Sequence, residues 1–90
     1  MTYLVEVTQG DIDNGKPRIC GECAIALAAA RSVCVPHVKV HSGRISWYAS
    51  GRYRCAILPR NALTFIGVFD DEKHGKRFVS PFSFQIEVPD

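Results

Sequence analysis

The stretch "VKVHSGRISWYASGRYRCAI", residues 38–57, decides the fold, because two Ser-Gly pairs divide it into three segments of strand length. A two-residue turn at Ser42-Gly43 puts the apolar residues of the first two segments on the same side. This register gives three cross-strand pairs: His41 with Arg44, Val40 with Ile45, and Val38 with Trp47. The first two segments are therefore predicted to form a β-hairpin with one apolar face.

The second hairpin has two possible registers. A two-residue loop at Ser50-Gly51 would pair Trp47 with Arg54 and mix polar and apolar side chains on each face. A loop of three or five residues pairs Trp47 with Cys55 instead, and we expect this odd loop. The result is a three-stranded meander whose inward residues are Val38, Val40, Ile45, Trp47, Tyr53, Cys55 and Ile57.

The segments around the meander indicate two more strands and three helices. Tyr3, Val5 and Val7 alternate as in a strand, and Thr8 followed by Asp11 is typical of a helix start. The run "GECAIALAAARS" predicts a buried helix, since it is rich in alanine and nearly uncharged. A third helix, with Ala62, Leu63, Ile66 and Phe69 at helical spacing, runs from Pro59 to Asp70, and Phe82, Phe84, Ile86 and Val88 mark a closing strand.

These elements predict one small α+β domain over residues 1–90. Its antiparallel sheet contains the N-terminal strand, the meander and the C-terminal strand, with the helices packed on one face. The chain has 90 residues, 47% of them hydrophobic and 22% charged, and a net charge of +2. We expect a cytoplasmic protein, because the sequence shows neither a secretory signal nor an apolar run long enough for a membrane span.

Several motifs resemble those of a group of small proteins encoded in bacteriophage and bacterial genomes. The shared features are "VEVTQGDIDNG", "CGECAIALA", "LPRNALTFIGVFD" and "PFSFQIEV". Members often have proline where this chain has Ala24, and a shorter stretch in place of residues 72–77. The resemblance implies a fold and a phage context, and it carries no catalytic residue to this chain.

The four cysteines, Cys20, Cys23, Cys34 and Cys55, leave three interpretations open. They could complete a tetrahedral zinc site, but the last two lie far from the Cys20-x-x-Cys23 pair and form no second close pair. A redox dithiol at a helix N-terminus is the second interpretation, and it lacks the strand that precedes such motifs. We expect the third, packing residues near a helix cap, with no metal and no cofactor.

No catalytic constellation is indicated. His37, His41 and His74 have no nucleophile at a suggestive spacing, and the acidic run of Asp70, Asp71 and Glu72 is typical of a solvated surface. We therefore expect a binding protein and not an enzyme.

The predicted register places basic and aromatic side chains on the face opposite the core, or at its rim. They are His37, Lys39, His41, Arg44, Tyr48, Arg52 and Arg54. This face could contact a host protein, for example as an inhibitor of a bacterial defence system such as CRISPR, or it could bind nucleic acid. We expect the protein partner, because Tyr48 is the one aromatic residue predicted to point outward. A homodimer and a merely solvated face are further alternatives.

Overall fold

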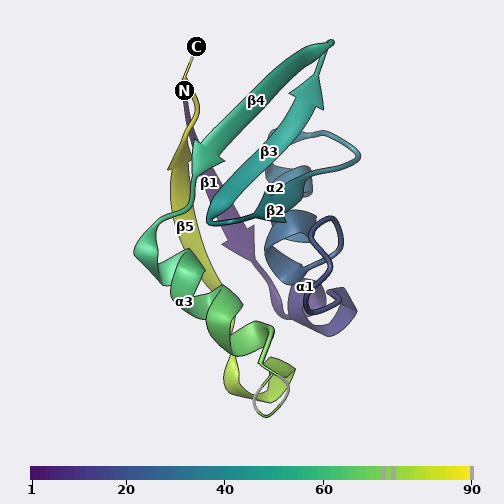
Figure 1. The fold of residues 1–90 in the computed structure, drawn as a ribbon, viewed down its shortest axis with the longest axis vertical. Helices are drawn as coiled ribbons and strands as arrows, with labels where there is room; N and C mark the ends of the chain where they lie inside the picture. Colours follow the sequence, from purple (N-terminus) through teal and green to yellow (C-terminus); the bar gives the residue numbers. More distant parts are fainter. Residues whose placement is uncertain (72, 74, 90) are drawn as a thin grey trace.

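The computed structural model describes residues 1–71, 73 and 75–89, and it confirms the α+β class. In chain order the elements are β1 (Thr2–Val7), α1 (Gln9–Asn14), α2 (Ala24–Val33), β2 (Lys39–His41), β3 (Arg44–Ala49), β4 (Arg52–Ile57), α3 (Arg60–Phe69), a short 3₁₀ helix (Gly75–Phe78) and β5 (Phe82–Glu87). Figure 1 shows the β3-β4 hairpin projecting at one end of the molecule, with α1 and α3 toward the other. Within the described ranges, no helix has the length and apolarity that a membrane span requires.

The strands form two antiparallel sheets and not the single sheet that we expected. β1 pairs with β5, and β2, β3 and β4 form a separate sheet in that order. β4 and β5 are in contact, but no backbone ladder joins them. After β4 the chain passes through Leu58 and Pro59 into α3, and proline has no N–H with which to extend a ladder.

The core lies between the two sheets and α2, as the apolar composition of this helix predicts. Five residues of α2 are buried: Ala24, Ile25, Ala26, Ala28 and Ala29. Their small side chains allow close packing against β1 and β2. The predicted alternation in the terminal strands is confirmed, since Val5, Val7, Phe84 and Ile86 are all buried.

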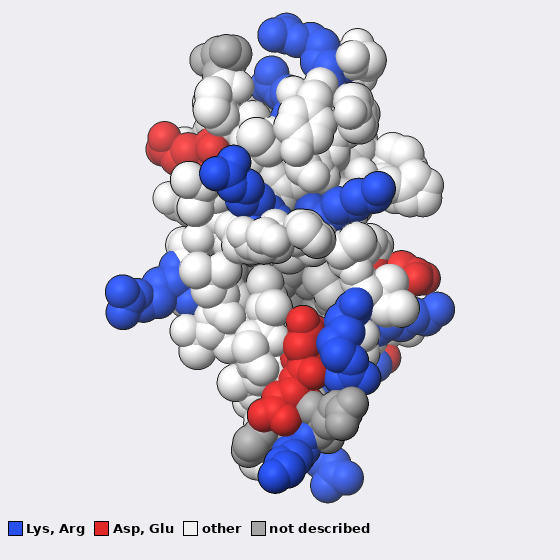
Figure 2. Space-filling model, in the orientation of Figure 1, with Lys and Arg blue, Asp and Glu red and all other residues white. Residues whose placement is uncertain are grey.

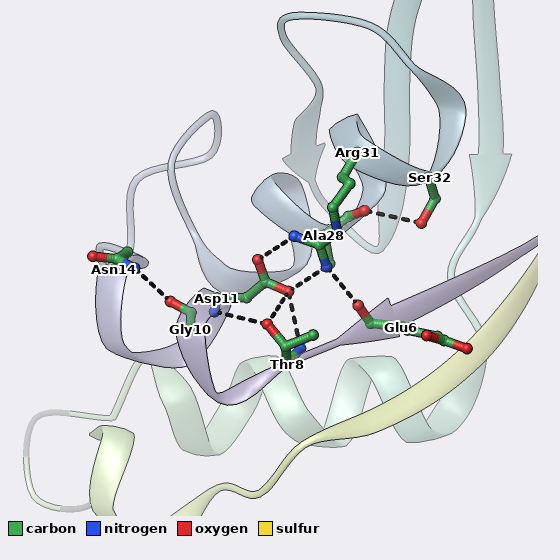
Figure 3. Close-up of polar contacts among 8 residues, drawn as sticks. All are labelled: Glu6, Thr8, Gly10, Asp11, Asn14, Ala28, Arg31 and Ser32. Atoms are coloured by element: carbon green, nitrogen blue, oxygen red, sulfur yellow. Dashed lines mark hydrogen bonds and ion pairs between the residues drawn. The ribbon is translucent and has the colours of Figure 1, made fainter.

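A polar network fixes α1 against α2 and β1 (Figure 3). Thr8 and Asp11 form a capping box, in which each side chain accepts a hydrogen bond from the other residue's backbone N–H, at 3.2 and 2.9 Å. Arg31 donates two bonds to the Asp11 carboxylate, at 2.8 and 2.7 Å, and one to the Glu6 carbonyl. Burial of Asp11 acts to raise its pKa, but the hydrogen bonds from Arg31 and Thr8 outweigh burial, and the pKa lies below its usual value.

Helix α3 buries most of the stripe that the spacing predicts, with Phe65 buried in the place expected of Leu63. Ala62, Phe65 and Phe69 are buried, whereas Leu63 is 44% exposed. Phe65 stacks on Phe69 and also lies against Phe82 of β5, with a ring-centroid distance of 4.8 Å in the second pair. The aromatic contact with β5 therefore sets which side of α3 faces inward.

The two hairpins have different outcomes. The register of the first is confirmed, with Val40 opposite Ile45 and His41 opposite Arg44, but the ladder ends before the expected pair of Val38 and Trp47. The odd loop predicted for the second is wrong, because Ser50-Gly51 forms a two-residue turn that pairs Trp47 with Arg54. Ser50 and Gly51 have φ values of 53° and 76°, which are those of a type I′ turn.

That turn reverses the predicted facing of β4. Tyr53, Cys55 and Ile57, expected inward, lie on the side away from the core, and Ala56 is buried instead. Ile57 is 72% exposed and Tyr53 is 59% exposed. Trp47 is buried and Tyr48 is exposed, as predicted.

Candidate functional site: the outer face of the β2-β3-β4 sheet

The side of the β2-β3-β4 sheet that points away from the core is the candidate site. Residues directly opposite each other in an antiparallel pair share a face, so the register identifies its members. We call this surface the outer face, and it consists of Lys39, His41, Arg44, Ser46, Tyr48, Tyr53, Cys55 and Ile57. It combines cations, aromatic rings and one exposed aliphatic side chain.

Most of the basic face predicted from sequence is present, but two arginines are misplaced. Lys39, His41, Arg44 and Tyr48 lie together on the outer face, and His37 is exposed just before β2. The prediction is wrong for Arg52 and Arg54, which face the other side because they pair with Ala49 and Trp47. The reason is the two-residue turn, which shifts β4 by one residue relative to the register that we expected.

Two tyrosines stand side by side on the outer face. Tyr48 and Tyr53 are cross-strand partners, and their rings lie edge to face with centroids 5.3 Å apart. Tyr53, Cys55 and Ile57 are not among the site residues predicted from sequence, because the hydrophobic pattern of β4 favours the other register. The signal for their true position was the repeated Ser-Gly pair, since the same dipeptide makes the same turn in both hairpins.

A hollow of about 470 Å³ lies next to the tyrosines, at the edge of β3. Its lining residues are Pro36, His37, Lys39, Ser46, Trp47, Tyr48 and Tyr53. The volume falls within the range of about 300 to 1,000 Å³ that is typical of ligand pockets. Aromatic and basic residues dominate the lining, and it contains no carboxylate.

The sheet lies in a segment without acidic residues. Between Glu22 and Asp70 the sequence has no Asp or Glu, and it has six Lys or Arg residues: Arg31, Lys39, Arg44, Arg52, Arg54 and Arg60. In Figure 2, Lys and Arg side chains lie over the region of β3 and β4, and the acidic side chains lie at its margin or below it. Glu72 of the acidic run that follows α3 falls outside the described residues. The outer face thus suits an anionic ligand.

The four cysteines do not form the zinc site that was one alternative. They are free thiols: Cys20 is exposed in the loop before α2, Cys23 is buried and Cys34 exposed at opposite ends of α2, and Cys55 lies half-buried on the outer face. In the described part of the chain, no group of three or more His, Cys, Asp or Glu side chains could hold a metal ion. His74, one of the histidines considered in the sequence, lies outside the described residues.

Cys23 acts as the N-cap of α2, and its sulfur accepts a hydrogen bond from the N–H of Ala26 at 3.4 Å. Burial raises the pKa of the Cys23 thiol, and the charge of Asp70 acts in the same direction, against the bonds from backbone N–H groups. A raised pKa disfavours the thiolate that a redox dithiol needs. This geometry supports a packing and capping role for Cys23.

A second, smaller cavity of about 240 Å³ adjoins this cysteine, between residues 18–23, the first hairpin turn and α3. Cys20, His41 and Asp70 also line it. Asp70 is already engaged, because its carboxylate accepts a hydrogen bond from the backbone N–H of Arg18 at 2.9 Å. The cavity contains no arrangement of these groups that indicates catalysis.

Neither the protein-family models, nor the curated proteins, nor the solved structures with which the chain was compared show a match. The resemblance to small phage and bacterial proteins therefore stays a prediction. Fold and site together describe a small α+β protein with an open sheet face that is basic and aromatic.

Proposed function

We propose that the protein binds single-stranded nucleic acid through the outer face and has no catalytic activity of its own. The observation that carries this proposal is the exposed pair of Tyr48 and Tyr53. Aromatic side chains on which bases stack are a common feature of surfaces that bind single strands. The expectation of a protein partner depends on Tyr48 as the one outward aromatic residue and on the resemblance to phage proteins, and the exposed Tyr53 removes the first of these reasons.

The charges near the tyrosines support the same proposal. Lys39 and Arg44 lie on the same outer face as the tyrosines, Lys39 lines the hollow with them, and no carboxylate of β2, β3 or β4 opposes these cations. A phosphate backbone gains most of its affinity from such contacts, with release of counterions. The modest net charge of +2 is compatible with this, because the acidic residues lie in other segments of the chain.

Fluorescence anisotropy with labelled (dT)15 and (U)15 and the purified protein tests the proposal. The double variant Tyr48→Ser/Tyr53→Ser should bind at least about tenfold more weakly, since each base stacked on an aromatic ring contributes about 1 to 3 kcal/mol. Lys39→Gln and Arg44→Gln should each lower the salt dependence of log K by about 0.7. Leu4→Ser is the matched control, because Leu4 is an exposed apolar residue on β1.

The wild-type protein should bind at low salt, and the Leu4→Ser variant should bind equally well. If neither oligonucleotide binds at 50 mM salt, or if the double tyrosine variant binds as tightly as the wild type, the proposal is wrong. Circular dichroism of each variant separates a loss of binding from a loss of fold.

The exposed Ile57 favours a second candidate function, the contact with a host protein that we expected from the sequence. An aliphatic side chain that is 72% exposed adds little to phosphate binding, whereas apolar patches with basic rims are common in protein interfaces. An Ile57→Ser variant should then lose a partner retained from host lysate but keep oligonucleotide binding. With this second function we would expect the protein to act in the cytoplasm, as an inhibitor of a host defence system. Light scattering of the purified protein tests the homodimer.

A further inference from the structure

We propose that the hollow beside β3 binds one nucleotide unit, with its base against the tyrosines and its phosphate near Lys39. This inference deepens the proposed function and rests on it. The chemistry required is a planar base joined to a phosphate. Such a unit is available either from a free nucleotide or from an unpaired position in a strand.

Strand β2 covers only part of the edge of β3. Val40 donates its backbone N–H to the carbonyl of Cys20, at 2.8 Å, which lies on the side of β2 away from β3. Alternate residues of an antiparallel strand bond to the same neighbour, so Lys39 and His41 make the bonds to β3. Their partners are Ser46 and Arg44, and the next residue of β3 in this series is Tyr48.

Tyr48 pairs with Tyr53 of β4, but β2 supplies no partner for it on the opposite edge of β3. The ladder between β2 and β3 ends at the pair of Lys39 and Ser46, because the preceding residues 36–38 leave the sheet. Within the described residues, no backbone bond reaches Tyr48 from this side. Its N–H and C=O therefore point outward from this edge, which borders the hollow, and offer one donor and one acceptor.

The groups that line this hollow match those of a nucleotide. The edge of a base carries both donors and acceptors, so it can bond to an adjacent backbone N–H and C=O. The rings of Tyr48 and Tyr53 offer apolar surface for the base, and Lys39, which also lines the hollow, offers positive charge for the phosphate. An extended acidic peptide could also use the edge and the charges, but it would not need the aromatic walls.

Fluorescence of Trp47 provides the test, because it is the single tryptophan and it lines the hollow. The wild type is titrated with thymidine monophosphate, (dT)10, a decamer of abasic sugar phosphates and a decamer of glutamate. We expect (dT)10 to bind at least tenfold more tightly than the abasic decamer, and the backbone amide of Tyr48 to shift in ¹⁵N spectra only when bases are present. Saturation by the monophosphate alone identifies free nucleotide as a source, and binding of the decamer alone identifies a strand.

Two variants locate the effect. Ser46→Leu adds volume to the wall of the hollow and should remove the difference between (dT)10 and the abasic decamer. Arg60→Gln is the control for Lys39→Gln, because Arg60 is an exposed cation on α3 and does not line the hollow. Equal binding of the two decamers by the wild type overturns the nucleotide site but leaves phosphate binding by the outer face intact. Failure of every oligonucleotide overturns both proposals, and tighter binding of the glutamate decamer assigns the hollow to an acidic peptide.

Discussion

Two regions of the molecule differ in whether local backbone structure agrees with the hydrophobic pattern. The two agree in the N-terminal region, from β1 through α2, and they conflict in the β3-β4 hairpin. In the first region the capping box of Thr8 and Asp11 begins α1 so that Ile12 is buried, and Arg31 joins the same carboxylate to α2. In the hairpin the type I′ turn exposes Ile57 and turns Arg54 toward the side of the core. The first region combines a helix cap, an ion pair and buried apolar residues that agree, whereas the hairpin leaves Tyr53 and Ile57 exposed.

This difference separates structural from functional signals. A region in which capping, pattern and packing agree gains stability from each of them and needs no external partner to explain it. A hairpin in which the turn overrides the pattern loses the burial of an isoleucine and a tyrosine. The outer face is therefore the part of the molecule where we propose that a ligand binds.

The largest expected effect tests whether the outer face is open. Ile45 is fully buried and Ile57 is 72% exposed, although both lie in the same sheet. Ile45→Ala should lower the free energy of unfolding by about 2 to 5 kcal/mol, and Ile57→Ala should change it by less than about 0.5 kcal/mol. Urea unfolding followed by Trp47 fluorescence measures both. Similar losses in the two variants would mean that the outer face is covered in solution.

This pair of isoleucines also shows how far the sequence could predict the structure. The position of Ile45 was predictable, because the turn at Ser42-Gly43 and the apolar alternation require the same register. The position of Ile57 was not, since the pattern of β4 favoured one register and the Ser50-Gly51 turn imposed the other. The turn determines the register there, because the backbone of a type I′ turn matches the right-handed twist of the two strands that it joins.

The candidate site was predictable only in part, for two physical reasons. Lys39, Arg44 and Tyr48 follow from the first hairpin, and their predicted positions on the outer face are confirmed. Tyr53 depends on the second turn. The hollow depends on where β2 begins and on the path of residues 36–38, which is a tertiary feature without a periodic signal.

A second prediction concerns the N-terminal region, through Asp11. Asp11→Ala removes both the helix cap and the partner of Arg31, and it should cost about 2 to 3 kcal/mol at neutral pH. The pKa of Asp11 is lowered in the folded protein, so its contribution is present above the unfolded pKa of about 3.9 and is lost as pH falls through the folded value. Urea unfolding at a series of pH values from 7 to 2.5 measures this dependence.

The isosteric variant Asp11→Asn is the control for the charge. It keeps a side-chain acceptor near Thr8 and loses the ion pair with Arg31. Its stability should fall less steeply with acid than that of the wild type. A wild-type protein whose acid dependence equals that of Asp11→Asn would show that the ion pair contributes nothing measurable.

The smallest expected effects concern the turn that sets the register of the second hairpin. Gly51 has φ of 76°, in the left-handed region, and a Cβ at this position would contact nothing. Gly51→Ala should therefore lose about 1 kcal/mol through backbone strain alone, and Gly43→Ala should lose a similar amount because its φ is 74°. Ser50→Asn should gain less than about 0.5 kcal/mol, since Asn-Gly suits a type I′ turn better than Ser-Gly. Urea midpoints measure all three changes, and ¹⁵N spectra report whether Trp47 and Arg54 stay paired. If Ser50→Asn lowers the stability, the turn is not the element that holds Tyr53 and Ile57 on the outer face.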